Sequence, residues 1–396
     1  MADPMPSTWR ALQLGDVVTL SRGIDLPVQS RLDGLYPVIG SSGIVGYHSA
    51  MAAHGPGVLV GRSGSVGEVR YVEEDYWPLN TTLWVTDFHG NDPLFVSFFL
   101  QHLELGRFTA GVSVPTLNRN ILHRIEVQLP SVAEQRTIAH ILHTVQEATD
   151  VRRRELALER EHKAALMEYL LTHGTRREPL EMTQFGEIPK SWKLCQLREL
   201  VRANITDGTH KTPTYVADGV PFITAKDIIA NRIVFDCCSH ISQAEHLVLS
   251  KRVRPERGDV LLTKVGTVGN AALVEDSIEF SIFVQVALIK PKQDLLYPRF
   301  LLYSLQSERG QSDLRNKSAL STMRFIGTQK IALLRIALPS FQEQLEISRA
   351  LEASDSKVAA LVREIALLDE LFRSMLEELM TGRLSAIPLI EEHQPQ

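Results

Sequence analysis

The chain has 396 residues and a net charge of −5, which allows two or three domains, and its 44% apolar and 22% charged composition is ordinary for a globular protein. No apolar run approaches the ~20 residues that a membrane span requires, and the opening MADPMPSTWR lacks a secretory pattern. Three cysteines supply neither a disulfide framework nor a zinc quartet, which favours the reducing cytoplasm.

Residues 1–130 predict a strand-rich domain. GPGVLVGRSGSVGEVRYV, residues 55–72, is typical of a strand, a glycine turn and a second strand, and TTLWVTD predicts the next strand. A short helix is expected over PLFVSFFLQHL, residues 93–103. The glycine turn lacks the Gly-Lys-Ser/Thr of a phosphate-binding loop and continues as a strand, so it indicates a tight turn and not a nucleotide site. A basic residue recurs in the second copy of the turn, Arg62 matching Lys264, which adds the possibility of a phosphate contact beside the turn.

A long helix is predicted over residues 131–173. It begins at LPSVAEQ, where Ser131 and Glu134 have the spacing of a capping box, and the proline before them prevents an earlier start. About 40 helical residues extend ~60 Å. A polar linker is expected over residues 174–190.

The second half of the chain repeats the first. Four pairs of stretches recur in the same order, which indicates an internal duplication. They are TWRALQLGDVV (8–18) with SWKLCQLRELV (191–201), VLVGRSGSVG (58–67) with VLLTKVGTVG (260–269), DPLFVSFFLQ (92–101) with YPRFLLYSLQ (297–306), and LPSVAEQRTIAHIL (129–142) with LPSFQEQLEISRAL (338–351). The repeat predicts a second domain at 191–339, a second long helix at 340–383 and a flexible tail at 384–396.

The second helix carries an apolar seam of 4-3 spacing that is typical of a coiled coil. Its members are Ile347, Leu351, Ser354, Val358, Leu361, Ile365, Leu368, Phe372, Met375 and Leu379. The first helix has a weaker seam, with Thr149, Arg152, Glu159 and Lys163 among Ile138, Leu142, Val145 and Leu156. We expect the two helices to pair antiparallel, with one domain at each end. The predicted fold class is therefore α+β: two duplicated β-rich α/β domains separated by two long antiparallel coiled-coil helices.

Enzymatic motifs are absent from the sequence, and charge is unevenly divided. No Gly-x-Ser-x-Gly, His-Glu-x-x-His or glycine-rich S-adenosylmethionine loop occurs, and the histidines have no ligand spacing. Residues 1–130 carry a net charge of −4, whereas residues 190–339 carry +7, with basic loops at KRVRPERGD (251–259) and DGTHKTP (207–213). Such loops favour contact with phosphate in the second domain, although KRVRPERGD could equally be a solvated loop before a strand.

Several of these stretches together resemble the specificity subunit of type I restriction–modification systems, over essentially the whole chain. The matching stretches are IPKSW, DGTHKTP with GVPFITAKDI, RGDVLLTKVGTVG, GRSGSVG, WPLNTTLWV and the twice-used LPS..EQ. The resemblance implies two target recognition domains that each read half of a bipartite double-stranded DNA sequence. It also implies helices that set their spacing and dock two methylation subunits, with two motor-nuclease subunits in the complete complex.

The resemblance further implies a non-catalytic chain without a cofactor or metal of its own. S-adenosylmethionine, ATP and magnesium would belong to the partner subunits. The acidic first domain departs from what DNA binding requires, and suggests that affinity depends on basic partner subunits. Two alternatives from other classes are a duplicated scaffold that binds protein or carbohydrate, and a self-contained methyltransferase, which the missing cofactor loop disfavours.

Base reading requires fork-shaped or bidentate side chains, assisted by hydroxyl and lysine groups. In the first domain, the candidates for DNA contact are Arg22, Arg31, Ser41, Ser42, Tyr47, His48, Arg62, Asn80 and Arg107. In the second domain, they are Thr209, His210, Lys211, Thr212, Lys226, Lys264, Lys317 and Arg324. Each could equally be a surface residue, and Asn80 a turn-stabilising one.

Overall fold

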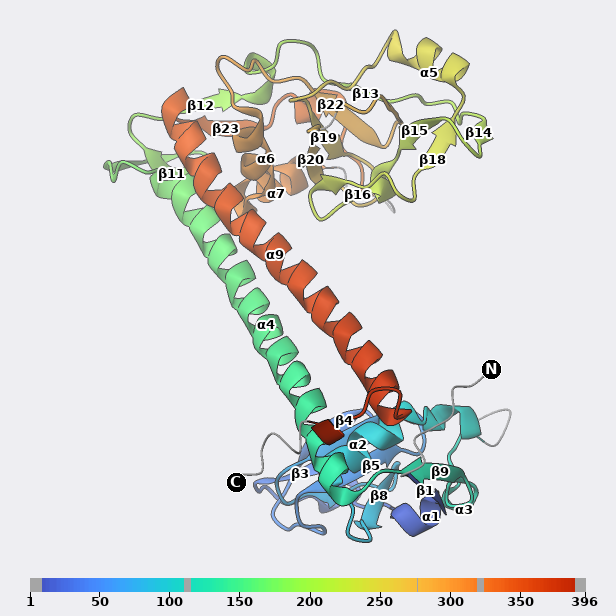
Figure 1. Cartoon of the computed structure of the whole chain (residues 1–396). Helices are drawn as coiled ribbons and strands as arrows, with labels where there is room; N and C mark the ends of the chain where they lie inside the picture. Colours follow the sequence, from blue (N-terminus) through green and yellow to red (C-terminus); the bar gives the residue numbers. More distant parts are fainter. Residues whose placement is uncertain (1–8, 110–114, 276, 319–323, 389–396) are drawn as a thin grey trace. The chain divides into compact units, whose positions relative to one another are not determined.

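A computed structural model of the chain describes residues 9–109, 115–275, 277–318 and 324–388. The chain forms two compact units, unit 1 of Met1–Arg154 with Leu361–Gln396, and unit 2 of Glu155–Ala360. Each unit contains one strand-rich domain and part of both long helices, α4 (Val132–His173) and α9 (Phe341–Met380) (Figure 1).

The centre of unit 1 is an antiparallel four-stranded sheet. Its strand order is β2 (Thr19–Arg22), β8 (Thr82–Asp87), β5 (Gly57–Gly61) and β6 (Val69–Val72). All of β5 is buried, as a continuous apolar run predicts for a strand covered on both faces. A second sheet consists of β4 (Gly43–His48), β3 (Tyr36–Gly40) and β7 (Trp77–Pro78), and β1 (Arg10–Gln13) pairs with β9 (Glu126–Leu129).

Helix α2 (Pro93–His102) supplies much of the unit 1 core. Asp92 caps it by accepting a hydrogen bond from the Phe95 backbone nitrogen (2.9 Å), and proline occupies its first position, where no backbone donor is needed. Phe95 and Phe99 stack and pack in one cluster with residues of the central sheet. The remaining short helices are α1 (Leu14–Val17), η1 (Val28–Ser30), η2 (Leu105–Phe108) and α3 (Arg119–Leu122).

Unit 2 repeats this arrangement. Its central antiparallel sheet has the order β13 (Thr206–Asp207), β22 (Val286–Ile289), β19 (Val260–Thr263) and β20 (Ala271–Leu273). A second sheet contains β14 (Tyr215–Val216), β18 (Ser239–Ile241), β15 (Val220–Ile223) and β21 (Ser281–Ile282), and β12 (Lys193–Gln196) pairs with β23 (Arg335–Leu338). The helices are η3 (Leu197–Glu199), η4 (Ala225–Asp227), α5 (Gln243–Ser250), α6 (Pro298–Gln306), α7 (Glu308–Lys317) and α8 (Thr328–Ile331).

The strands and short helices expected around both glycine turns are confirmed. The segment 174–190, expected to be a linker, contains a hairpin of β10 (Leu180–Thr183) and β11 (Gly186–Pro189), and β16 (Ile228–Ile229) and β17 (Arg232–Ile233) form another in unit 2. Of the tail expected at 384–396, residues 389–396 lie outside the described residues, while Ala386 is buried in the core of unit 1.

Within each unit, α4 and α9 lie side by side and run in opposite directions (Figure 1). In unit 1, Ile138 packs in one cluster with Leu379, while Arg152 Nε lies 2.7 Å from Glu364 Oε1. In unit 2, Ser354 Oγ donates to Glu159 Oε1 (3.0 Å), whereas Thr175 reaches Glu346. Partner numbers thus fall along α9 as they rise along α4.

Polar residues of α4 lie toward α9 where they interrupt the apolar seam of α4. Thr149 and Glu159 are buried, and Lys163 forms an ion pair with Asp355. The seam residues Ile347, Leu351, Leu361 and Leu379 of α9 are buried, and Val145, Leu156, Val358, Ile365, Leu368, Phe372 and Met375 are partly buried. Contacts between the helices therefore satisfy Glu159 and Lys163, while Thr149 Oγ1 donates to Val145 O of its own helix (2.8 Å).

The two LPS..EQ stretches begin the long helices, but only half of each predicted capping box forms. Ser131 and Ser340 each accept a hydrogen bond from the backbone nitrogen three residues on (3.3 Å), as expected. Glu343 turns away from its serine and accepts from the Thr175 backbone nitrogen (2.8 Å) and Trp192 Nε1 (3.2 Å). A buried carboxylate requires donors, and Thr175 and Trp192 supply two of them.

Candidate nucleic-acid interface

The glycine turns join a central strand to the edge strand beside it, β5 to β6 in unit 1 and β19 to β20 in unit 2, in closely similar backbone conformations. Gly64 and Gly67 have φ of +86°, and Gly266 and Gly269 have φ of +78° and +107°. Gly67 N donates to Gly61 O (2.8 Å), and Gly269 N to Thr263 O (3.0 Å). A Cβ on Gly67 would lie 2.5 Å from the backbone nitrogen of Gly106, so only glycine fits there.

Each turn holds a basic residue by matching backbone hydrogen bonds. Arg62 N donates to Thr81 O (2.8 Å), and its carbonyl accepts from Leu117 N (3.0 Å). Lys264 N donates to Gln285 O (2.8 Å), and its carbonyl accepts from Ile326 N (3.0 Å). The two side chains therefore start from equivalent places in the two domains.

In unit 1, five of the predicted DNA-contact residues gather at the first glycine turn. They are Arg22, Ser41, Arg62, Asn80 and Arg107. Ser41 Oγ lies 3.0 Å from where a Cβ on Gly64 would stand, and Gly106, beside Arg107 in η2, approaches Gly67. Asn80 hydrogen-bonds to Asp25, whose other oxygen is 3.7 Å from Arg22 NH2.

In unit 2, Asp207 links three basic side chains at the second turn. Its Oδ2 accepts from Lys264 Nζ at 2.6 Å, and its Oδ1 lies 3.3 Å from His210 Nε2 and 3.4 Å from Arg252 NH2. Burial alone would raise the pKa of Asp207, but the hydrogen bond and charge of Lys264, reinforced by His210, outweigh it and lower that pKa below the usual value.

The candidate residues Thr209, His210, Lys211 and Thr212 follow Asp207 in one loop. A hollow of about 410 Å³ borders this loop and the end of α5, with Arg252 and Ser281 in its lining. Arg252 NH2 also donates to the carbonyls of Asp207 (2.7 Å) and Gly208 (2.6 Å). Arg324 joins the group through its own carbonyl, which accepts from Gly266 N (3.1 Å).

Other candidates lie elsewhere or have structural partners. Arg31 NH1 donates to Val45 O (2.8 Å), and buried His48 accepts from Leu32 N at Nδ1 (3.0 Å) and packs against Trp77. These contacts hold the loop before β3 onto β4, where Tyr47 is 53% exposed. Ser42 is exposed at the hairpin tip beside Ser41, Lys226 is exposed on η4, and Lys317 is paired with Asp313 on α7.

Lys264 differs from the other candidates because it is buried. Only 4% of it is exposed, and its ammonium group lies against Asp207 and over the Phe325 ring (5.1 Å). A direct contact with a DNA phosphate would have to break this ion pair. Its geometry favours a role in holding the loop after β13.

The predictions from the sequence singled out the loops that contain Asp207 and Arg252 but not these two residues, and they did not include two buried glutamines. Gln135 Oε1 accepts from Asp92 N (3.1 Å) and its Nε2 donates to Pro130 O (3.1 Å), and Gln344 makes the same pair with Tyr297 N (2.8 Å) and Pro339 O (3.1 Å). The sequence could have indicated these glutamines, because each is the last residue of an LPS..EQ stretch and the stretch recurs in both halves of the chain. Nothing in the sequence around Asp207 indicates that Lys264, 57 positions away, is its partner.

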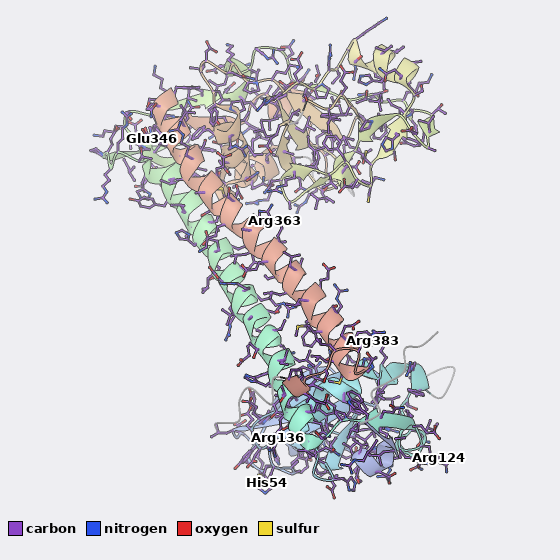
Figure 2. All side chains as sticks on the ribbon, viewed as in Figure 1. His54, Arg124, Arg136, Glu346, Arg363 and Arg383 are labelled. Atoms are coloured by element: carbon purple, nitrogen blue, oxygen red, sulfur yellow. The ribbon has the colours of Figure 1, made fainter. Side chains whose placement is uncertain are left out.

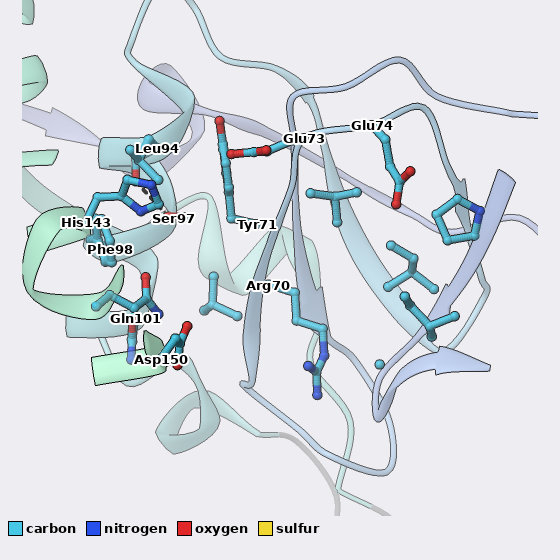
Figure 3. A pocket seen from close by; sticks show the side chains of 17 residues that line it. Arg70, Tyr71, Glu73, Glu74, Leu94, Ser97, Phe98, Gln101, His143 and Asp150 are labelled. Atoms are coloured by element: carbon cyan, nitrogen blue, oxygen red, sulfur yellow. Dashed lines mark hydrogen bonds between the residues drawn. The ribbon is translucent and has the colours of Figure 1, made fainter. Parts of the chain in front are cut away.

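Unit 1 also contains a hollow, of about 760 Å³, which lies between α2, β6 and α4 (Figure 3). Leu94, Tyr71, Glu73 and His143 border it, and His143 Nδ1 is buried with no hydrogen-bond partner among the described residues. In unit 2, Arg299 of α6 follows Pro298 as Leu94 follows Pro93, and it pairs with Glu275 and Glu352. In unit 2 a salt bridge thus stands where unit 1 has Leu94, and Arg299 and Glu275 also border a hollow of about 510 Å³.

Over the described ranges, no group of three or more histidine, cysteine or acidic side chains could hold a metal ion. Of the helices in that part of the chain, none is long and apolar enough to cross a membrane.

The comparison with known proteins matches both halves of the chain. A family model described as the type I restriction modification DNA specificity domain matches residues 6–160 and 189–368. The type I restriction enzyme MjaVIII specificity subunit of Methanocaldococcus jannaschii is 22% identical, over 96% of this chain and 94% of that protein. The EcoBI specificity subunit of Escherichia coli is 26% identical, over 70% of this chain and 62% of that protein.

Solved structures share the fold. The crystal structure of a type I restriction–modification S subunit from M. genitalium has a TM-score of 0.65 at 14% identity, covering 96% of this chain and 97% of that one. A chain from a study of complex assembly and conformational transition of the type I R-M system has a TM-score of 0.56 at 18% identity, covering 96% and 100%.

Proposed function

Because the chain belongs to the type I restriction–modification DNA specificity family, we propose that it is the subunit that reads the DNA target of such a complex. The proposal rests on one observation: each unit presents a glycine turn of the same geometry, surrounded by a different set of polar and basic side chains. Two similar but non-identical sites on one chain suit a bipartite target with two different half-sites.

We infer that the two halves arose by internal duplication and that α4 and α9 form a coiled coil. The central sheets have the same strand order, each with a parallel pair in the second sheet, β3 with β7 and β15 with β21. The 4-3 spacing of buried and partly buried residues along α9 supports the coiled coil.

The exposed sides of the long helices are the surface that we propose for docking two methylation subunits. Val362, Leu367 and Leu371 of α9 are 44%, 66% and 45% exposed, and Leu158 of α4 is 65% exposed. Apolar side chains on an exposed helix face are typical of a protein interface. Two motor-nuclease subunits would complete a restriction complex, and a solved relative comes from a study of type I R-M complex assembly.

The methylation and motor-nuclease reactions would be carried out by those partner subunits. The relatives are named as specificity subunits of type I restriction enzymes, and we propose that this chain is likewise a non-catalytic recognition subunit. S-adenosylmethionine, ATP and magnesium would bind the methylation and motor-nuclease subunits. The purified chain should therefore bind neither S-adenosylmethionine nor ATP, and micromolar binding of either ligand in titration calorimetry would contradict this prediction.

Single-molecule methylation sequencing tests the proposed function. The chain would be expressed together with a type I methylation subunit from the same organism, and the control would omit this chain. We expect adenine methylation at a single motif of two specified half-sites around an unspecified gap, only when the chain is present. Methylation that persists without the chain, or a motif without a gap, would refute the proposal.

A further inference from the structure

The two domains place opposite charges at one equivalent position beside the glycine turn. In unit 2, Asp207 pairs with Ala287 across the sheet, and Ala287 is the neighbour of Leu262. In unit 1, Arg22 pairs with Leu83, which is the neighbour of Val60. Arg22 therefore occupies the place of Asp207.

The partner position carries the same charge in both domains. Lys264 lies two residues after Leu262, and Arg62 two residues after Val60, and the backbone hydrogen bonds of Arg62 and Lys264 match. Unit 2 thus places a carboxylate opposite its lysine, at 2.6 Å. Unit 1 places an arginine opposite its arginine.

Because unit 1 has Arg22 where unit 2 has Asp207, no carboxylate at this position neutralises Arg62. Among the residues that the structure describes, no ion pair or side-chain hydrogen bond engages Arg62. Within the same part of the chain, the ion-pair partner of Arg22 is Asp25 at 3.7 Å, and the two side chains are 55% and 67% exposed, so that pair is weak. Two guanidinium groups near one turn without a buried carboxylate favour an anionic or oxygen-rich ligand.

We propose that Arg22 and Arg62 together form the DNA-contact site of the first domain, whereas Asp207 and Lys264 form a positioning pair in the second. The proposal rests on the function proposed above and assigns different roles to the matching positions. The ligand is a bidentate acceptor of DNA, either a phosphate or the O6 and N7 edge of guanine. It also offers a way for a domain with a net charge of −4 to engage DNA: among the described residues Arg62 has no ion-pair partner, and Arg22 has a weak, exposed one.

The test uses the chain co-purified with its methylation subunit and a duplex that carries the motif found by methylation sequencing. Binding is measured over a range of salt concentrations for Arg22→Ala, Arg62→Ala and the double variant. We expect each single variant to lose about 5- to 150-fold in affinity and the double variant to lose more, because one bidentate contact contributes about 1–3 kcal/mol and every 1.4 kcal/mol is about tenfold. Arg124→Ala is the matched control, since Arg124 is exposed in the same unit (Figure 2) and should bind as the parent does.

Two readouts separate the sources of the ligand. If the ligand is phosphate, each substitution lowers the slope of log affinity against log salt by about 0.9, the methylated motif is unchanged, and Arg62→Lys restores binding. If it is guanine, the motif relaxes at one base of a single half-site and Arg62→Lys does not restore it. Arg22→Asp installs the carboxylate of unit 2 beside Arg62, so it should weaken binding more than Arg22→Ala does.

The outcome that overturns the inference is a double variant with the affinity, salt slope and motif of the parent. Thermal unfolding is the control for folding. Both arginines are at least partly exposed, so each variant should keep the melting temperature of the parent. Failure of the proposed function itself looks different, because the parent complex would then bind no duplex and methylate no bipartite motif.

Discussion

At the scale of single residues, Asp207 is the group that holds the loop after β13 in the second domain. It accepts from buried Lys264 and lies within ion-pair distance of His210 and Arg252. Asp207→Asn leaves Lys264 buried without a counter-charge, so we expect the free energy of unfolding to fall by about 3 kcal/mol in urea denaturation. Asp218→Asn, an exposed change in the same domain, should leave stability unchanged.

The Asp207 contribution should also depend on pH in a defined direction. Its pKa is lower in the folded chain than in the unfolded chain, where it is about 4. The stability difference between the parent and Asp207→Asn should therefore be full above pH ~4 and shrink as pH falls through the folded pKa. A difference that persisted unchanged at the lowest pH would show that the carboxylate is not the stabilising group.

Arg299 and Leu94 provide a second residue-scale comparison. Arg299 Nε lies 3.3 Å from Glu352 Oε1 and also pairs with Glu275, whereas Leu94 borders the open hollow with Glu73 and His143. Arg299→Leu should lower the melting temperature by about 2–4 °C, which corresponds to ~1 kcal/mol. Leu94→Arg should raise it slightly or leave it unchanged, because it supplies Glu73 with a partner, and a fall as large as that of Arg299→Leu would contradict the correspondence.

At the scale of elements, the two long helices are held by an apolar seam with polar interruptions. Leu361 is buried, and Ile365 is partly buried one turn later. Leu361→Asp with Ile365→Asp places two carboxylates in that seam, at a cost of several kcal/mol. We expect loss of the assembled complex in size-exclusion chromatography and loss of methylation in cells. Ala366→Asp changes an exposed position of the same helix and should leave both intact, while unchanged methylation in the double variant would exclude the helix pair as the assembly element.

At the scale of the whole molecule, we propose that the length of α4 and α9 sets the gap between the half-sites. Two similar domains on an antiparallel helix pair would be related as the halves of a dimer are, which suits half-sites about one helical turn, roughly 10 base pairs, apart. Inserting four residues after Asp150 and four after Ala359 adds ~6 Å to each helix. With base pairs ~3.4 Å apart, the gap should widen by one or two base pairs while both half-sites stay unchanged.

Methylation sequencing of the parent and the insertion variant decides this prediction. An unchanged gap or an altered half-site would refute the role of the helices as spacers. The matched control inserts four residues after Ala359 alone, which leaves the seam out of register along part of its length and should abolish assembly.

Properties that depend on neighbours along the chain could be predicted from the sequence. Apolar runs and glycines predicted β5 and β19 with their turns, the 4-3 spacing predicted α9, and LPS..EQ predicted where both long helices begin. Burial of side chains at a fixed helical or strand period, and the positive φ that only glycine adopts without strain, act over a few residues. The repeat then transferred each prediction to the other half of the chain.

Pairings between distant residues were decided only by the tertiary structure. The sheet register brings Lys264 to Asp207, the packing of α9 turns Glu343 from its serine toward Trp192, and α6 places Arg299 between two glutamates. The sequence identified Arg62 and Lys264 as equivalent basic residues, but not that one is free among the described residues and the other neutralised. A cation's role depends on which charges the fold places within a few ångströms of it, and that distance is set by strand pairing between segments far apart in the chain.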